Sequence, residues 1–154
     1  MELVEATRAD LDLLAEYWYD LATSMEQYGE LNEIAQEGPQ AAIEGFEGLF
    51  AEDETSVYLI VAADEQVGFL VLREHERPSR VYSSVIDIVD LYVAPEWRDG
   101  GFGSEAIDAV EAIAQDRDAD SITVSCEWHN DGARRFYEDN GFEPKQVTYA
   151  QRVD

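Results

Sequence analysis

Residues 90–104 read Asp90-Leu-Tyr-Val-Ala-Pro-Glu-Trp-Arg-Asp-Gly-Gly-Phe-Gly-Ser104, and this stretch decides the fold of the chain. Its apolar first part has the character of a β-strand and ends at Pro95. A glycine-rich turn from Arg98 to Gly103 follows, and a helical pattern begins at Ser104. A strand that leads through small residues into a helix start presents main-chain N–H groups at the positive end of the helix dipole. The stretch therefore predicts a binding site for a phosphate or pyrophosphate group.

The spacing of the glycines separates this loop from two better-known phosphate loops. A Walker loop ends in Gly-Lys-Ser or Gly-Lys-Thr, and no lysine occurs here. A dinucleotide fingerprint requires Gly-x-Gly-x-x-Gly in a first βαβ unit, which neither the spacing nor the position along the chain satisfies. The pattern that fits is Arg-x-x-Gly-x-Gly, formed by Arg98, Gly101 and Gly103.

This pattern resembles the loop that holds the pyrophosphate of acetyl coenzyme A (acetyl-CoA) in the GCN5-related N-acetyltransferase (GNAT) superfamily. A second segment strengthens the resemblance. Residues 130–142 read Asn-Asp-Gly-Ala-Arg-Arg-Phe-Tyr-Glu-Asp-Asn-Gly-Phe. They are similar, at every fixed position, to the superfamily signature Asn-x-x-Ala-x-x-Phe-Tyr-x-x-x-Gly-Phe. Because both motifs occur in the expected order, the chain is identified as a member of this superfamily.

The resemblance covers nearly the whole chain and implies a single GNAT domain over residues 1–154. The implied fold is α/β, or α+β by some schemes, with a twisted, mixed, mostly antiparallel sheet of about six or seven strands and about four helices. Strands four and five are expected to be parallel and splayed apart. The periodicity of the chain predicts strands at Leu3–Ala6, Val57–Ala63, Gln66–Arg73, Val81–Val93, Ser121–Glu127 and Gln146–Arg152. It predicts a helix that begins at Thr7–Asp10. Three further helices are predicted over Pro39–Phe50, Ser104–Arg117 and Gly132–Asn140.

By resemblance, the cofactor lies in the gap between the splayed strands. Its pantetheine arm is expected to bond the main chain of the fourth strand, as an added strand would. Asn130 is expected either to bond this arm or to shape the turn before the following helix, and Phe136 to pack. The expected cofactor-binding residues are Leu91, Tyr92, Val93, Arg98, Asp99, Gly100, Gly101, Phe102, Gly103, Ser104, Asn130, Ala133, Phe136 and Tyr137.

Acetyl transfer to an amine requires a base for the amine and an acid for the departing thiolate. Asp87 and Asp90 are the candidate bases. In a regular strand they lie on opposite faces, so both reach one site only if the strand is irregular. The choice between them stays open at the level of sequence. Tyr137 is the expected acid, since the matching tyrosine of the superfamily lies beside the cofactor sulfur. No histidine stands in the motif beside Cys126, so we expect direct attack without an acyl-enzyme.

Composition limits the classes of partner. The chain has 154 residues, of which 35 are acidic and 10 basic, and a formal net charge of −25. No basic patch is present for nucleic acid, and no apolar run is long enough for a membrane. The charged N-terminus is unlike a signal peptide, so a soluble cytoplasmic protein is expected. Acidic residues spread along the whole chain are typical of extreme halophiles, because molar salt screens their repulsion. His75 and His129 lack partners at metal-ligand spacing, so no metal is expected.

The acceptor amine stays open. The acidic segment from Glu26 to Glu37 lies where the superfamily walls the acceptor site, and it favours a cationic amine. A polyamine-like molecule, an antibiotic amine and a protein N-terminus or lysine all fit this expectation. Succinyl-CoA is an alternative donor, and a homodimer is an open arrangement. The alternative function is a non-catalytic module that binds acyl-CoA or serves in a complex.

Overall fold

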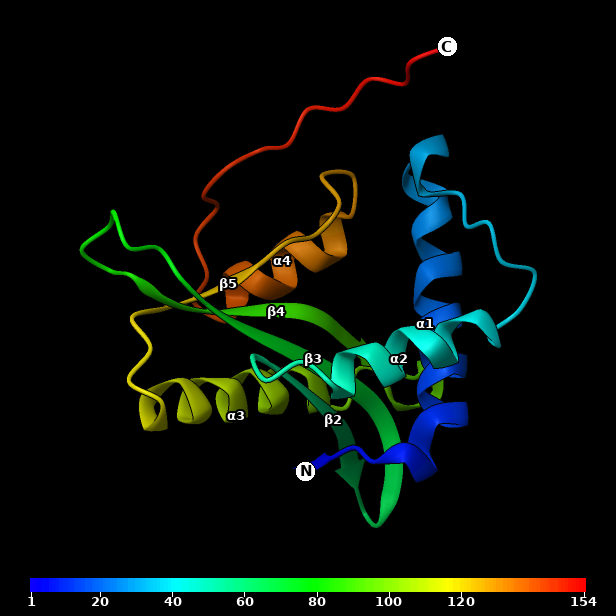
Figure 1. The fold of residues 1–154 in the computed structure, drawn as a ribbon, viewed down its shortest axis with the longest axis horizontal. Coiled ribbons are helices and arrows are strands. Elements are labelled where there is room, and N and C mark those ends of the chain that lie inside the picture. Colours follow the sequence, from blue (N-terminus) through cyan, green and yellow to red (C-terminus); the bar gives the residue numbers. More distant parts are fainter.

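The computed structural model describes residues 1–154 and contains a five-stranded sheet in the order β1-β2-β3-β4-β5 (Figure 1). All neighbouring strands are antiparallel except β4 and β5, which are parallel. The strands are β1 Glu2–Glu5, β2 Thr55–Ala62, β3 Glu65–Glu76, β4 Ser84–Val93 and β5 Ser121–Val124. The four α-helices are α1 Leu11–Met25, α2 Ala41–Phe50, α3 Phe102–Asp116 and α4 Asp131–Asp139. The expected mixed sheet, four helices and parallel β4–β5 pair are therefore confirmed.

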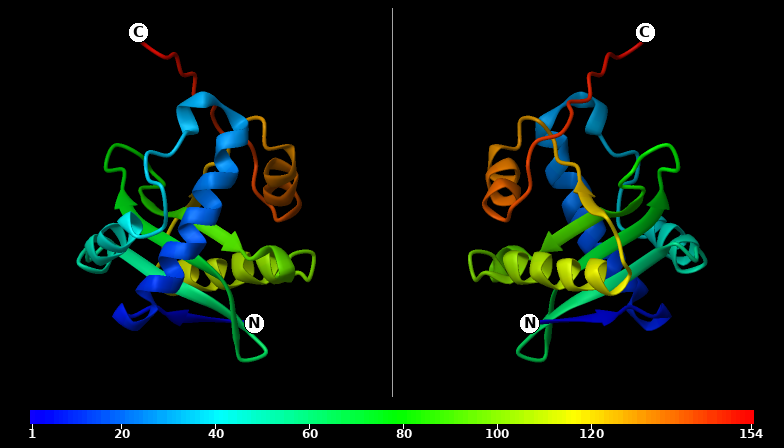
Figure 2. Two further views of the ribbon diagram at one scale, coloured as in Figure 1. Left: turned by 90° about the vertical axis from the view of Figure 1, so that its right-hand side faces the viewer. Right: turned by 90° about the vertical axis from the view of Figure 1, so that its left-hand side faces the viewer.

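Helices cover both faces of the sheet (Figure 2). Leu14 of α1 and Phe46 of α2 pack with Phe69 of β3 in one core cluster. Ile107 and Val110 of α3 lie in a second cluster on the opposite face, against which α4 also packs. Because β2 and β3 are covered on both faces, their sequences are nearly continuous apolar runs instead of alternating ones.

A β-bulge interrupts β4 where the site begins. The consecutive residues Val71 and Leu72 of β3 lie opposite Asp90 and Ile88, so Val89 is an extra residue without a partner. An extra residue shifts the alternation of side chains by one position and bends the strand. The irregularity that the sequence left open therefore exists, and it lies between the two candidate bases.

The parallel strands separate at the same level. β5 pairs with β4 only as far as Val124, opposite Ile88. Beyond the bulge, β4 continues to Val93 along β3 alone. The pairing of the two strands therefore ends at the level of the bulge.

Several predicted boundaries are wrong. The sheet has five strands because residues 146–152 form none, and Tyr149 within them is 92% exposed. A strand requires a neighbour for its hydrogen bonds, and this tail runs away from the sheet (Figure 1). β5 ends at Val124 instead of Glu127 because its partner strand has diverged. Residues 81–83 precede β4 instead of forming its start, and Val81 is 90% exposed.

The β2–β3 hairpin turns through Ala63 and Asp64, one residue earlier than predicted. Both residues have positive φ values, 52° and 63°, as a two-residue type I′ turn requires. Elsewhere in the fold, no helix has the length and apolar character that crossing a bilayer would require.

Candidate active site

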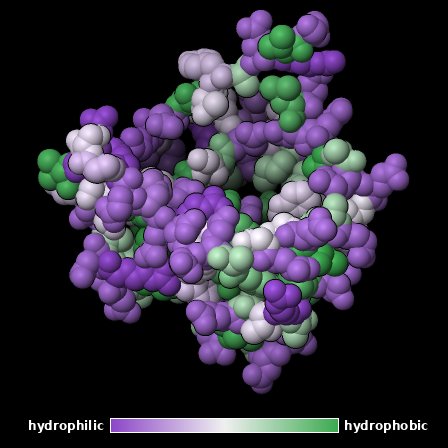
Figure 3. Space-filling view, viewed as in Figure 1, coloured by the Kyte–Doolittle hydropathy of each residue, from purple (hydrophilic) through white to green (hydrophobic).

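A cleft of about 1040 Å³ opens where β4 and β5 separate. It extends from the loop before α3, along the second half of β4, to the end of α1. Two short 3₁₀ turns, η2 Glu26–Tyr28 and η3 Glu30–Asn32, follow α1 and form its far wall. The space-filling view shows a mostly hydrophilic surface that is hollowed below the free end of α1 (Figure 3).

The loop before α3 supplies main-chain donors at one end of the cleft. None of the N–H groups of residues 99–104 meets a hydrogen-bond acceptor, whereas the N–H of Glu105 bonds the carbonyl of Gly101 at 3.0 Å. These free donors lie at the positive end of a 15-residue helix. An array of unpaired donors at a helix start fits a phosphate or diphosphate group, as the sequence predicts.

Two glycines of this loop are required for different structural reasons. Gly101 has a φ of +85°, in the left-handed region that a side chain disfavours. Gly103 is constrained by packing, since a Cβ there would lie 3.0 Å from Cζ of Phe136. The glycine at 103 therefore brings the start of α3 against α4. Gly100 does not line the cleft.

Arg98 is partly occupied within the loop itself. Its Nε donates to the carbonyl oxygen of Val93 at 2.8 Å, and its guanidinium lies 5.6 Å from the ring centre of Tyr92. The side chain thus ties the loop to the end of β4. Only the remaining N–H groups of the Arg98 guanidinium are available to an anion. Most of the free donors at this end of the cleft therefore belong to the main chain.

The bulge places Asp87 and Asp90 on the same face of β4. Their partners on β3, Arg73 and Val71, are two residues apart and therefore point to one face of the sheet. Their surroundings nevertheless differ. Asp87 accepts a hydrogen bond from Thr123 Oγ1 at 2.7 Å and does not line the cleft. Asp90 lines the cleft and makes no hydrogen bond within the protein. Burial raises the pKa of Asp90 from 3.8 to about 6, although the positive charge of Arg73 acts in the opposite direction.

Tyr137 lines the same cleft from α4. Its ring packs edge-on against Phe136 and Phe142, with centroid distances of 5.2 and 5.7 Å. Its hydroxyl has no hydrogen-bond partner in the protein. Burial, together with the nearby ionisable groups of Cys126 and Asp90, raises the pKa of Tyr137 to about 12. The phenol is therefore protonated throughout the neutral range and available as a proton donor.

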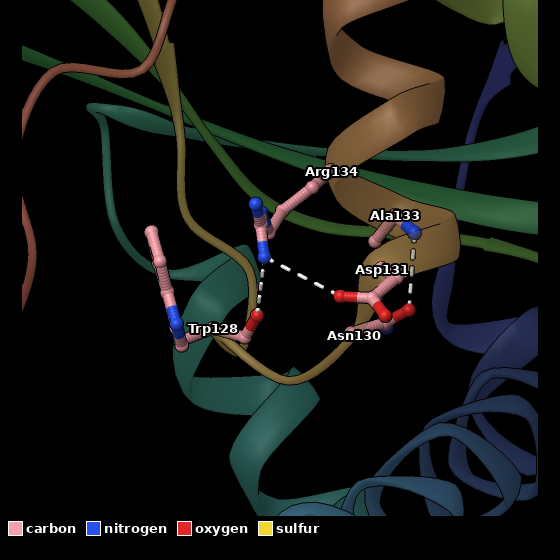
Figure 4. A network of polar contacts seen from close by, with 5 residues as sticks. All are labelled: Trp128, Asn130, Asp131, Ala133 and Arg134. Atoms are coloured by element: carbon pink, nitrogen blue, oxygen red, sulfur yellow. Dashed lines mark hydrogen bonds and ion pairs between the residues drawn. The ribbon is translucent and has the colours of Figure 1, made fainter.

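The start of α4 is fixed by its own side chains (Figure 4). The amide oxygen of Asn130 accepts from the N–H of Ala133 at 3.0 Å, as an N-cap. Arg134 donates to the carbonyl of Trp128 and to the carboxylate of Asp131, and it lies 4.2 Å from the ring centre of Trp128. Of the two roles expected for Asn130, the structure shows the shaping of this turn.

The structure brings together nearly all of the site residues expected from the sequence. Of those residues, only Asp87 and Gly100 lie outside the lining of the cleft. Asn32 and Ile34 come from the Glu26–Glu37 segment that the resemblance placed at the wall of the acceptor site. Other lining residues were not anticipated, among them Trp18, Leu21, Met25 and Glu127. Of these, only Trp18 and Leu21 have a sequence signal, a helical spacing that by itself indicates core packing.

Comparison with known proteins shows the family of the chain. The acetyltransferase (GNAT) family matches residues 14–142 of the chain. The uncharacterized N-acetyltransferase YhfO of Bacillus subtilis (strain 168) is 34% identical over 125 residues, which cover 80% of this chain and 81% of YhfO. With this extent of similarity, the protein belongs to the GNAT family of acetyltransferases, whose members use acetyl-CoA.

Solved structures share the fold at lower identity. A tetramutant of the BH1408 protein from Bacillus halodurans superimposes with a TM-score of 0.88 at 20% identity, covering 99% of this chain and 100% of that one. The aminoglycoside antibiotic 6'-N-acetyltransferase AAC(6')-IG from Acinetobacter haemolyticus superimposes with a TM-score of 0.74 at 16% identity, covering 100% of both chains. These likenesses concern the fold alone.

Proposed function

We propose that this GNAT protein transfers the acetyl group of acetyl-CoA to a primary amine by direct attack of the amine on the thioester. The observation that carries the proposal is the position of free N–H groups, those of Asp99 and of residues 101–104, in the same cleft as Asp90 and Tyr137. Main-chain donors at one end suit the diphosphate of the cofactor, which supplies an activated acetyl group. A base and an acid suit the two proton transfers.

Asp90 takes the proton of the amine. An alkyl ammonium has a pKa near 10, so a base must produce the neutral nucleophile at neutral pH. The pKa of about 6 leaves Asp90 ionised at neutral pH, and it is nearer to the working pH than that of an ordinary aspartate. Asp87 has no such role in this proposal because its carboxylate is bonded to Thr123 outside the cleft.

Tyr137 gives a proton to the leaving sulfur. Its hydroxyl is free of protein partners, and burial in the cleft wall holds the ring in place. Cys126 also lines the cleft, but partial desolvation raises the pKa of its thiol, although the residue as a whole is exposed. A thiol is a much poorer nucleophile than a thiolate, which supports direct attack instead of an acyl-enzyme.

The test is the variant Tyr137→Phe, assayed for release of free thiol from acetyl-CoA with a panel of primary amines. We expect turnover to fall by about 100-fold, as for loss of a general acid, while the dissociation constant for acetyl-CoA changes little. The matched control is Tyr58→Phe. Tyr58 is also buried, but its hydroxyl accepts a hydrogen bond from Arg117 outside the cleft.

The assay is run both at low salt and in about 2 M KCl, where charge repulsion is screened. Equal turnover of Tyr137→Phe and the unmodified protein would remove Tyr137 from the mechanism. Tight binding of acetyl-CoA without thiol release for any amine would instead favour the alternative function, a non-catalytic acyl-CoA-binding module.

A further inference from the structure

None of the carboxylates in the acidic segment Glu26–Glu37 lines the cleft. Its members that line the cleft are neutral, namely Gln27, Tyr28, Asn32 and Ile34. The carboxylate of Glu26 accepts the N–H of Ile34 at 3.2 Å, which holds the loop together. Glu30 pairs with Arg152 at the surface. A carboxylate at the far end of the cleft must therefore come from another segment.

That carboxylate belongs to Glu127, which follows β5. Apart from Asp99 in the loop before α3, Asp90 and Glu127 are the only carboxylates that line the cleft. Glu127 is partly buried, whereas its neighbours Cys126 and Trp128 are exposed. No cation of the protein lies within salt-bridge distance of it. Arg134, the nearest arginine along the chain, is directed to Trp128 and Asp131 instead.

Asn32 holds Glu127 in position. Its amide nitrogen donates to Oε1 of Glu127 and also to the carbonyl of Met25 at 3.1 Å. Asn32 thereby joins the end of α1, the turn η3 and the segment after β5 across the far end of the cleft. Both amide hydrogens of Asn32 are used, and Oε2 of Glu127 has no protein partner. A partly buried carboxylate with a free oxygen and no cation is suited to bind a positive charge on a ligand.

Apolar side chains line the same cleft as the two carboxylates. Trp18, Leu21, Met25 and Ile34 are among them. Such a lining favours methylene groups over further charges. The cleft thus presents one carboxylate near Tyr137, a second carboxylate held by Asn32, and an apolar lining.

We propose that Glu127, positioned by Asn32, binds a second cationic group of the acceptor, so that the substrate class is aliphatic diamines or longer polyamines. This inference rests on the proposed acetyltransferase function and deepens it. In this arrangement the amine that reacts lies near Asp90 and Tyr137. The distal ammonium donates to the free oxygen of Glu127, and the alkyl chain contacts the apolar lining.

The test compares 1,4-diaminobutane with n-butylamine, which has the same chain length but a single charge. For the unmodified protein we expect kcat/KM to be about tenfold higher for the diamine, as for one charge-assisted hydrogen bond. In Glu127→Gln this ratio should fall to near one, mainly through a higher KM for the diamine. Glutamine keeps the size of the side chain and an acceptor for Asn32, so the fold is preserved.

The matched control is Glu33→Gln, which removes one exposed carboxylate beside Asn32 but outside the cleft. Its ratio of kcat/KM should equal that of the unmodified protein. Asn32→Ala should raise the KM for the diamine about threefold with little change in kcat, because the orientation of Glu127 is lost while its charge remains. If Asn32 has only a structural role, Asn32→Ala should lower the melting temperature without raising KM selectively over kcat.

Two outcomes would overturn the inference, and they are distinguishable. If the unmodified protein acetylates n-butylamine and 1,4-diaminobutane with equal kcat/KM, or if Glu127→Gln leaves the ratio unchanged, Glu127 has no such role and the acetyltransferase function stands. If no amine causes release of thiol, both the function and the inference fail.

Discussion

The two ends of the cleft are built in different ways. The phosphate-loop end consists of main-chain N–H groups from consecutive residues, 99–104. The acceptor end, which binds the amine in our proposal, consists of side chains that come from separate elements, with Asn32 after α1, Asp90 on β4 and Glu127 after β5. The first end depends on local backbone conformation. The second depends on individual side chains and on the packing that brings their elements together.

The largest effect is expected at the second end, from Asp90→Asn. Removing the base should lower turnover by about 100-fold with a saturating amine, while acetyl-CoA binding is retained. Thiol release and calorimetric titration measure the two quantities. Asp87→Asn is the matched control on the same strand face, and it should retain turnover because Asp87 lies outside the cleft.

Equal losses in the two variants would contradict the distinction that the bulge makes between these aspartates. The pH profile offers a second check. Because Asp90 has a pKa of about 6, kcat/KM should decline as the pH falls below about 6. This limb of the profile should disappear in Asp90→Asn.

The same variant should change stability in the opposite direction. The folded-state pKa of Asp90 lies above its ordinary value of 3.8, so the folded protein binds a proton more tightly than the unfolded chain. The ionised carboxylate is therefore unfavourable to folding above pH 6. Asp90→Asn should raise the free energy of unfolding by up to roughly 3 kcal/mol at pH 8, and the gain should vanish toward pH 4. Urea titrations at both pH values measure it, and a gain independent of pH would contradict this account.

At the phosphate-loop end, the comparison of Gly101→Ala with Gly132→Ala tests the dependence on backbone conformation. Gly101 has a φ of +85° with open space around its Cβ position, so alanine there should cost about 1 kcal/mol through strain alone. It should also weaken acetyl-CoA binding. Gly132 lies in the first turn of α4, where the nearest atom to a Cβ would be at 3.7 Å.

Gly132→Ala should therefore be neutral or should stabilise the protein by up to about 1 kcal/mol. Chemical unfolding and titration with acetyl-CoA measure both variants. Identical behaviour of the two alanine variants would show that the left-handed conformation at Gly101 is unimportant.

The smallest effect expected is an opposite response of the two ends to salt. Asp99 and Glu105 flank the loop, and the net charge of −25 repels an anionic cofactor. Raising KCl from 0.1 to 1 M shortens the screening length from about 10 to about 3 Å. The dissociation constant for acetyl-CoA should then decrease, while the KM for a cationic amine should increase. If both constants change in the same direction, the local charges at each end of the cleft do not control binding.

The conformation of the phosphate-loop end was predictable because it is formed by contiguous residues. A positive φ at Gly101 and a helix start after it are local properties, and the segment that holds Asn130 and Tyr137 is equally compact. The predicted strand at 146–152 failed for the opposite reason. A strand forms only where a neighbouring edge accepts its hydrogen bonds, and no local pattern shows whether that edge is reached.

The choice between Asp87 and Asp90 illustrates the same limit. Both follow apolar residues in one predicted strand, and the sequence leaves them equivalent. The register of β4 against β3 inserts Val89 as a bulge, after which Asp87 bonds to Thr123 while Asp90 enters the cleft. Glu127 was missed because nothing near it in the sequence indicates that Asn32, far along the chain, holds it.

By itself, the sequence determined the order of the main elements, the family of the protein and the glycine-rich loop with its free main-chain N–H groups, because these depend on local propensity and on short contiguous motifs. Only the tertiary structure decided where β4 and β5 part, which aspartate faces the cleft and which carboxylate stands at its far end. These features arise from strand register and from contacts between distant segments, and such contacts have no counterpart in the spacing of neighbouring residues.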